Sequence, residues 1–130
     1  MRVSLSAAND NTAPIVLLVE DEFFVRCSIA SCLRDAGYVV VETDNGEEAI
    51  ALCQSDMSFD IVFTDINLAG SASGFDVAEY FRMVRPHVPV LYTSGKSIDP
   101  QRCVPGSVFV AKPYSSNEIL SACQRVTAGT

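Results

Sequence analysis

The regular alternation of short apolar runs with segments of helical periodicity constrains the fold of this chain more than any other feature. The first run, IVLLV at 15–19, is continuously aliphatic, as in a strand that is buried on both faces. Further apolar runs follow it, and most of them are separated by amphipathic segments. Alternating strands and helices are typical of parallel sheets. We therefore predict an α/β fold with a doubly wound, parallel, five-stranded sheet covered by helices on both faces.

The expected elements occupy nearly the whole chain. We expect strands at 14–20, 38–43, 60–65, 88–95 and 107–112, and helices at 22–37, 47–55, 75–84 and 116–126. Helical spacing places Val77, Phe81 and Val84 on the inward side of the third helix. Ser115 and Glu118 have the spacing of a capping box at the start of the last helix.

The connection KSIDPQRCVPG at 96–106 is the weak position in this alternation. It contains Pro100 and Pro105, and a proline interrupts a helix because it lacks the backbone donor and clashes with the preceding turn. We expect at most one helical turn here, so the fourth crossover helix should be short or irregular.

The length of the chain, 130 residues, suits one domain with its own core. We predict a domain over 14–127, with a flexible N-terminal tail at 1–13 and a C-terminal tail at 128–130. No apolar stretch approaches the roughly 20 residues of a membrane span, and no secretory signal precedes the first strand. The five cysteines lack C-x-x-C spacing, so we expect reduced core thiols in a cytoplasmic protein.

The charge of the chain argues against a nucleic-acid partner. The formal net charge is −7, and the nine basic residues are scattered. A nucleic-acid surface needs clustered Lys and Arg side chains. We therefore expect neither nucleic acid nor a membrane among the partners.

Polar side chains stand where the predicted strands end. In a parallel α/β sheet the carboxyl ends of the strands share one edge, and ligands bind there. We expect that edge to collect Glu20 and Asp21 from the first strand, Asp65 from the third, Thr93 and Ser94 from the fourth, and Lys112 from the fifth.

Crowded carboxylates at one edge need a positive partner to remain ionised. Mg²⁺ prefers oxygen ligands and often joins one or two carboxylates to a phosphate, so we predict a magnesium site that supports phosphoryl transfer. An aspartate can serve as the nucleophile. With an ordinary pKa of about 3.9 an aspartate is already ionised at neutral pH. The sole histidine, His87 in RPHVP, reads as an exposed spacer.

These residues, in this order, resemble the receiver domain of bacterial two-component response regulators, over about residues 14–127. The resemblance implies a flavodoxin-like (βα)5 fold with strand order 2-1-3-4-5. It assigns Asp21 as a direct Mg²⁺ ligand, Glu20 as a ligand acting through water, and Asp65 as phosphoacceptor and ligand. Asn67 would offer its backbone carbonyl to the same ion.

The resemblance also assigns a conformational switch. It implies that Ser94, with Thr93 as the competing alignment, and Lys112 bond the phosphoryl group, while Phe109 fills the space that Ser94 vacates. The peptide from Lys112 to Pro113 is typically cis in this family. Phe109 also reads as a core residue, and Glu22 as a helix cap rather than a site residue.

The sequence departs from the family pattern in the loop INLAGSASG at 66–74, which is long and has Ala69 where a proline is usual. Lys96 and Asn67 occupy positions that vary across the family and tune dephosphorylation. The short fourth helix puts the family's usual dimerisation and signalling surface in question. Phe23, Phe24 and Tyr114 flank the proposed cleft and are expected to shield it in part.

We predict a stand-alone receiver that takes a phosphoryl group from a histidine kinase or a histidine phosphotransfer protein. It would signal through protein contact to a downstream target or act as a phosphate relay or sink, as a monomer or weak dimer. It would not be an enzyme beyond its own phosphorylation and dephosphorylation. A fragment of a longer protein is the alternative organisation. The alternative functions are a Mg²⁺-dependent phosphohydrolase with a Rossmann-like sheet and a receiver that acts unphosphorylated.

Overall fold

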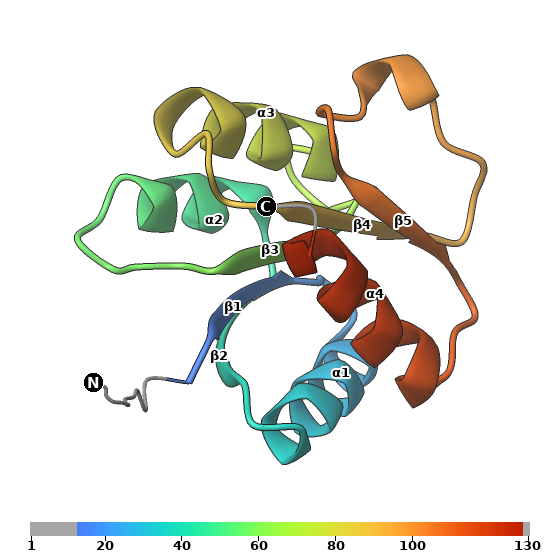
Figure 1. Ribbon diagram of the computed structural model, residues 1–130. Helices are drawn as coiled ribbons and strands as arrows, with labels where there is room; N and C mark the ends of the chain where they lie inside the picture. Colours follow the sequence, from blue (N-terminus) through green and yellow to red (C-terminus); the bar gives the residue numbers. More distant parts are fainter. Residues whose placement is uncertain (1–12, 129–130) are drawn as a thin grey trace.

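The computed structural model of the protein describes residues 13–128. The predicted C-terminal tail lies outside them except for residue 128, and so does the N-terminal tail except for residue 13. The elements are β1 (Ile15–Val19), α1 (Phe23–Asp35), β2 (Val39–Thr43), α2 (Gly46–Cys53), β3 (Ile61–Asp65), α3 (Gly74–Val84), β4 (Val90–Ser94), η1 (Pro100–Arg102), β5 (Val108–Ala111) and α4 (Ser116–Ala128). Their order follows the predicted alternation, with a short 3₁₀ turn in place of a fourth crossover helix (Figure 1).

The strands form one parallel sheet in the order β2-β1-β3-β4-β5. This confirms the flavodoxin-like topology. The buried central strands β3 and β4 are covered on both faces, as expected for a parallel sheet whose crossovers place helices on either side.

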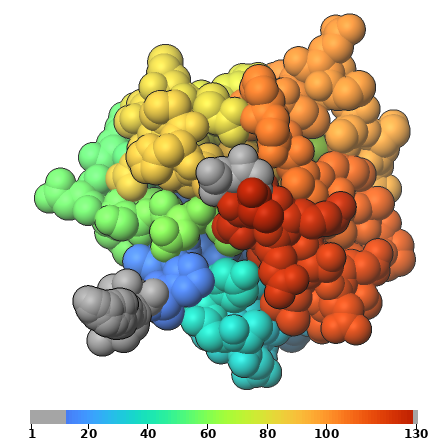
Figure 2. Space-filling model, viewed as in Figure 1, coloured from blue at the N-terminus to red at the C-terminus, as the bar shows by residue number. Residues whose placement is uncertain are grey.

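The helices divide between the two faces of the sheet. Helices α2 and α3 lie together on one face, and α1 and α4 lie on the other (Figure 1). Side chains alternate along β1. Leu17 and Val19 pack into the core on the α2 and α3 face, while Val16 and Leu18 pack into the core on the α1 and α4 face. Figure 2 shows the C-terminal third, orange to red, forming one side of the molecule in this view.

Local capping fixes where the helices begin. Glu22 accepts a hydrogen bond from Val25 N at the start of α1, which confirms its reading as a cap. Ser115 and Glu118 exchange the two hydrogen bonds of a capping box at α4, as their spacing predicts. No helix in the described part of the chain is long and apolar enough to cross a bilayer.

The connection between β4 and β5 contains η1 alone, which confirms the expectation of at most one turn. Arg102 attaches it to α3 through ion pairs with Glu79 at 2.9 Å and Asp76 at 3.3 Å. The Tyr92 hydroxyl accepts a hydrogen bond from Val104 N at 3.1 Å. The segment is therefore held to the molecule by side chains rather than by helical packing.

Two expectations about burial are wrong. Val84 is 46% exposed because the chain leaves α3 at Arg85, and Val88 fills the core at that end instead. The cysteines are not all core thiols, because Cys27 is exposed. Cys32 and Cys103 are partly exposed, and Cys53 and Cys123 are buried. His87 is exposed, as predicted.

Candidate functional site

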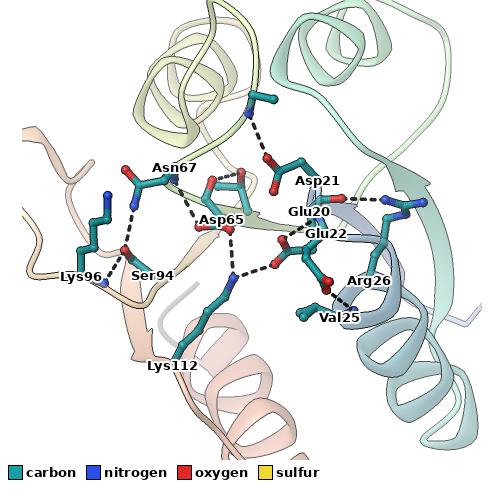
Figure 3. A network of polar contacts seen from close by, with 12 residues as sticks. Glu20, Asp21, Glu22, Val25, Arg26, Asp65, Asn67, Ser94, Lys96 and Lys112 are labelled. Carbon is teal, nitrogen blue, oxygen red and sulfur yellow. Dashed lines mark hydrogen bonds and ion pairs between the residues drawn. The ribbon is translucent and has the colours of Figure 1, made fainter.

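The carboxyl ends of four strands deliver polar side chains to one edge of the sheet (Figure 3). Strands β3 and β4 pair Asp65 with Thr93, and β4 and β5 pair Ser94 with Ala111. Lys112 is the next residue after β5, so the in-register ladder carries it to the same edge as Asp65. Sequence separation is large here, but the parallel register makes these residues neighbours.

Lys112 forms the centre of the charge network. Its Nζ atom lies 3.0 Å from Asp65 Oδ2 and 3.0 Å from Glu20 Oε1. Burial by itself would lower the pKa of Lys112, but the hydrogen bonds and charges of Asp65 and Glu20 outweigh it and raise that pKa. The ammonium therefore stays protonated and bridges two strands that are not adjacent in sequence.

Glu20 is buried, with 1% of its surface exposed. Burial raises its pKa, and hydrogen bonds from Lys112 and from Glu22 N offset only part of that effect. Arg26 donates a hydrogen bond to the backbone oxygen of Glu20 at 2.9 Å. The Glu20 side chain is therefore held in place, and its charged form carries a desolvation penalty that a further cation would reduce.

Asp21 points toward Glu20 and Asp65 from the exposed side of the site (Figure 3). One carboxylate oxygen from each of the three residues lies within 4.8 Å of the others. The ammonium of Lys112 contacts two of these carboxylates, so negative charge remains in excess. Oxygen donors at this spacing fit a small hard cation such as Mg²⁺, whereas soft metals prefer sulfur or imidazole ligands.

Ser94 is linked to Asp65 through Asn67. The Asn67 backbone N–H donates to Asp65 Oδ1 at 3.2 Å, and its side-chain amide donates to Ser94 Oγ at 3.0 Å. Lys96 N also donates to Ser94 Oγ at 3.0 Å. Both acceptor positions of the hydroxyl are thus occupied, which leaves its O–H free to donate.

Thr93 pairs with Asp65 in the ladder and points to the opposite face of the sheet from Ser94, because successive side chains alternate along β4. Its hydroxyl is buried without a well-formed hydrogen bond, as is that of Tyr114 nearby. Burial raises the pKa of Tyr114 to about 12. Among these hydroxyls, Ser94 is the one that hydrogen bonds connect to Asp65.

The remaining expected residues surround this centre. Phe109 is partly buried against the core on the α2 and α3 face, and its switch role stays a prediction. The peptide from Lys112 to Pro113 is cis. A cavity of about 640 Å³ beside the site is lined by Phe24 and Tyr114 among others. Phe24 is 76% exposed, so its shielding of the cleft is slight.

Two contacts at the site were not predicted from the sequence. Ala69 N donates a hydrogen bond to Asp21 Oδ2 at 3.0 Å. Glu47, at the start of α2, accepts hydrogen bonds from the same loop at Ser71 and Ala72. The unusual length of this loop was the only feature of the sequence that pointed to such contacts. It did not indicate which side chain would hold the loop.

Comparison with known families matches residues 16–124 to the response regulator receiver domain. The cell cycle transcriptional regulator CtrA of Caulobacter vibrioides is 30% identical over 115 residues, covering 85% of this chain and 49% of that protein. The crystal structure of a response regulator receiver protein from Sinorhizobium medicae has a TM-score of 0.86 and 31% identity, and the match covers 91% of this chain and 98% of that one.

The chemotaxis response regulator CheY4 of Vibrio cholerae is also similar, with a TM-score of 0.77 and 29% identity over 88% of this chain and 99% of that chain. The chain spans about half the length of the curated relatives it matches. The family match and these relatives do not favour the phosphohydrolase alternative.

Proposed function

The chain belongs to the response regulator receiver domain family, and on that premise we propose that it accepts a phosphoryl group on Asp65 from a phosphohistidine donor. The donor would be a histidine kinase or a histidine phosphotransfer protein. The supporting observation is the position of Asp65, which is 5% exposed, 3.0 Å from Lys112 Nζ and beside two further carboxylates.

The transfer forms one bond and breaks one. A carboxylate oxygen of Asp65 attacks the phosphorus, and the P–N bond to the donor histidine breaks. The electron pair of that bond remains on the imidazole nitrogen, which takes a proton from solvent. We assign no general base to the reaction, because a carboxylate nucleophile carries no proton that must be removed. The protein contributes mainly position and charge neutralisation.

Glu20, Asp21 and Asp65 would hold Mg²⁺, with the Asn67 carbonyl as a further proposed ligand. When bound, the ion neutralises negative charge on the transferred phosphoryl group. Lys112 stays protonated and offers its ammonium to the phosphoryl oxygens. The free O–H of Ser94 supplies a hydrogen-bond donor once the side chain turns toward them.

Phosphorylation of Asp65 replaces one carboxylate charge by about two phosphoryl charges. Movement of Ser94 toward the new group would leave a space beside Phe109, and rotation of Phe109 into it would change the surface near β5. A two-state element of this kind transmits a local charge change to a partner. We propose that the output is protein contact or onward phosphate transfer, with no catalysis of other substrates.

Incubation with acetyl phosphate and Mg²⁺ tests the proposal directly. Intact-mass measurement should show the addition of one phosphoryl group to the wild type, and chelation of Mg²⁺ should prevent it. The matched variant Asp65→Asn keeps the size and should remain unmodified. A wild type that stays unmodified, or an Asp65→Asn variant that labels equally well, contradicts the proposal. Steady turnover of small phosphate esters would instead support a hydrolase.

A further inference from the structure

The loop that follows β3 is attached to the first turn of α2 by Glu47. The Oε2 atom of Glu47 accepts hydrogen bonds from Ser71 N at 2.8 Å and Ala72 N at 3.1 Å, and also from the Ser71 hydroxyl. All three donors converge on a single carboxylate oxygen. An exposed glutamate with only a solubilising role would not be engaged in this way.

The packing beneath Glu47 is equally close. A Cβ atom placed on Gly46 would lie 2.7 Å from Ala72 O, so the backbone of α2 and the loop are in direct contact. Gly70 has a φ of +96°, and a Cβ there would lie 3.1 Å from Glu47 Oε1. Glycines at these two positions allow the loop to rest on α2, and Glu47 then closes the contact.

The same loop reaches Asp21 at its other end. Ala69 N donates to Asp21 Oδ2 at 3.0 Å, two residues before the contacts of Ser71 with Glu47. The side chain of Asp21 is otherwise exposed, so it would lose rotamer freedom on binding an ion. A fixed N–H donor reduces that loss by holding one oxygen in place.

We propose that Glu47 is a positioning residue for the divalent-cation site, acting through the loop at 69–72 on the carboxylate of Asp21. The inference rests on the proposed function, because it assumes that Asp21 binds Mg²⁺. Partners that orient a metal ligand from outside the coordination sphere affect affinity although they never touch the ion.

The variants Glu47→Ala and Glu47→Gln distinguish a role of Glu47 in positioning the loop from an effect of its negative charge on Mg²⁺ affinity. Both remove one negative charge, but the glutamine keeps a carbonyl oxygen that accepts the same hydrogen bonds. With Mg²⁺ alone as the probe, calorimetric titration of Glu47→Ala should give a dissociation constant raised about tenfold, the low end of losses at such partners. Glu47→Gln should bind nearly as tightly as the wild type.

Hydrogen exchange of the Ala69 amide supplies a second readout. It should accelerate in Glu47→Ala and remain slow in Glu47→Gln, while thermal unfolding shows that both variants are folded. Ser71→Ala, which removes only the hydroxyl donor, should weaken Mg²⁺ binding in the same direction but less. These results would support a positioning role.

Other results separate the inference from its premise. Equal weakening in Glu47→Ala and Glu47→Gln assigns the effect to charge and overturns the inference. Wild-type affinity in Glu47→Ala also overturns it and leaves the proposed function intact. A wild type that binds no Mg²⁺ overturns both together.

Discussion

The ammonium of Lys112 lies 3.0 Å from carboxylate oxygens of two residues at the carboxyl ends of different strands, and both of those residues are buried. Replacement by methionine would keep much of the side-chain volume but leave Glu20 and Asp65 without their shared cation. Breaking one side of a buried ion pair typically costs 3–5 kcal/mol. Because a quarter of the Lys112 side chain (25%) is exposed, water should reduce the loss, and we expect about 2–3 kcal/mol.

Urea unfolding of Lys112→Met at neutral pH without divalent ions measures this loss. Acidification should reduce this loss of stability, because burial raises the pKa of Glu20 and its protonated form no longer needs the Lys112 cation. Lys96→Met is the matched control, since Lys96 is exposed and contacts Ser94 only through its backbone N–H. Equal stability of the two variants would show that the Lys112 contacts contribute nothing.

Glu47 gives a pH dependence of known sign. The Ser71 hydroxyl, together with backbone donors, lowers the pKa of Glu47 from an ordinary 4.5 to about 2. Folding therefore favours the ionised form, and this contribution is present above pH 4.5 and lost as the pH falls toward 2. The stability gap between the wild type and Glu47→Gln should narrow over that window. If the stabilities of the wild type and Glu47→Gln, measured by thermal unfolding, change in parallel with pH over that window, the hydrogen bonds to Glu47 do not favour its ionised form.

At the scale of whole elements, the first residue of α3, Gly74, packs directly against the backbone at the end of β3. A Cβ atom on Gly74 would lie 2.1 Å from Asp65 O and 2.7 Å from Ile66 Cα. Gly74→Ala must therefore move the end of β3 away from α3, at an overpacking cost of about 1–3 kcal/mol. Because Asp65 ends β3, acetyl phosphate should also label it more slowly.

Gly95→Ala is the control for this prediction, because its Cβ would meet only Lys112 Cβ at 3.9 Å, an ordinary contact. Denaturant unfolding and the rate of mass gain with acetyl phosphate measure the two effects. Wild-type stability and labelling in Gly74→Ala would mean that the helix shifts without disturbing the site.

The strand ends could be predicted from the sequence because each apolar run and the polar residue that ends it are adjacent in the chain. The same local signal could not choose between Thr93 and Ser94, which are both buried. The structure distinguishes them by a contact that no local signal encodes: Asn67 donates its side-chain amide to Ser94 Oγ and its backbone N–H to Asp65. The prediction from helical spacing that Val84 is buried was wrong, because the periodic pattern continues past the point where α3 leaves the core.

The contact between Glu47 and Ser71 could not be predicted at all. It joins residues 24 positions apart and depends on how two glycines let the loop rest on α2. Neither residue carries a pattern that distinguishes it from an ordinary exposed polar side chain. Contacts of this kind depend on the packing of complete elements, which no local periodicity encodes.

At the scale of the whole molecule, one parallel sheet gathers the acids of separate strands, so an ion bound there contacts residues that only the folded chain brings together. A ligand that binds the folded state alone stabilises it, by about 2.7 kcal/mol at a concentration one hundred times its dissociation constant. We expect Mg²⁺ to raise the free energy of unfolding of the wild type in this way. The effect should exceed that of NaCl at equal ionic strength, which screens the net charge of −7 without occupying a site.

Asp21→Asn is the variant that isolates this linkage. Asparagine retains an oxygen that can accept the hydrogen bond from Ala69 N, so the loop contact remains possible while one anionic ligand is lost. Because Asp21 is exposed, the variant should unfold close to the wild type without Mg²⁺ and gain much less on its addition. Urea titrations with and without Mg²⁺ measure both differences. If Mg²⁺ raises the free energy of unfolding equally in the two proteins, the ion binds away from Asp21. If Mg²⁺ stabilises neither protein, the crowded carboxylates are stabilised by Lys112 alone.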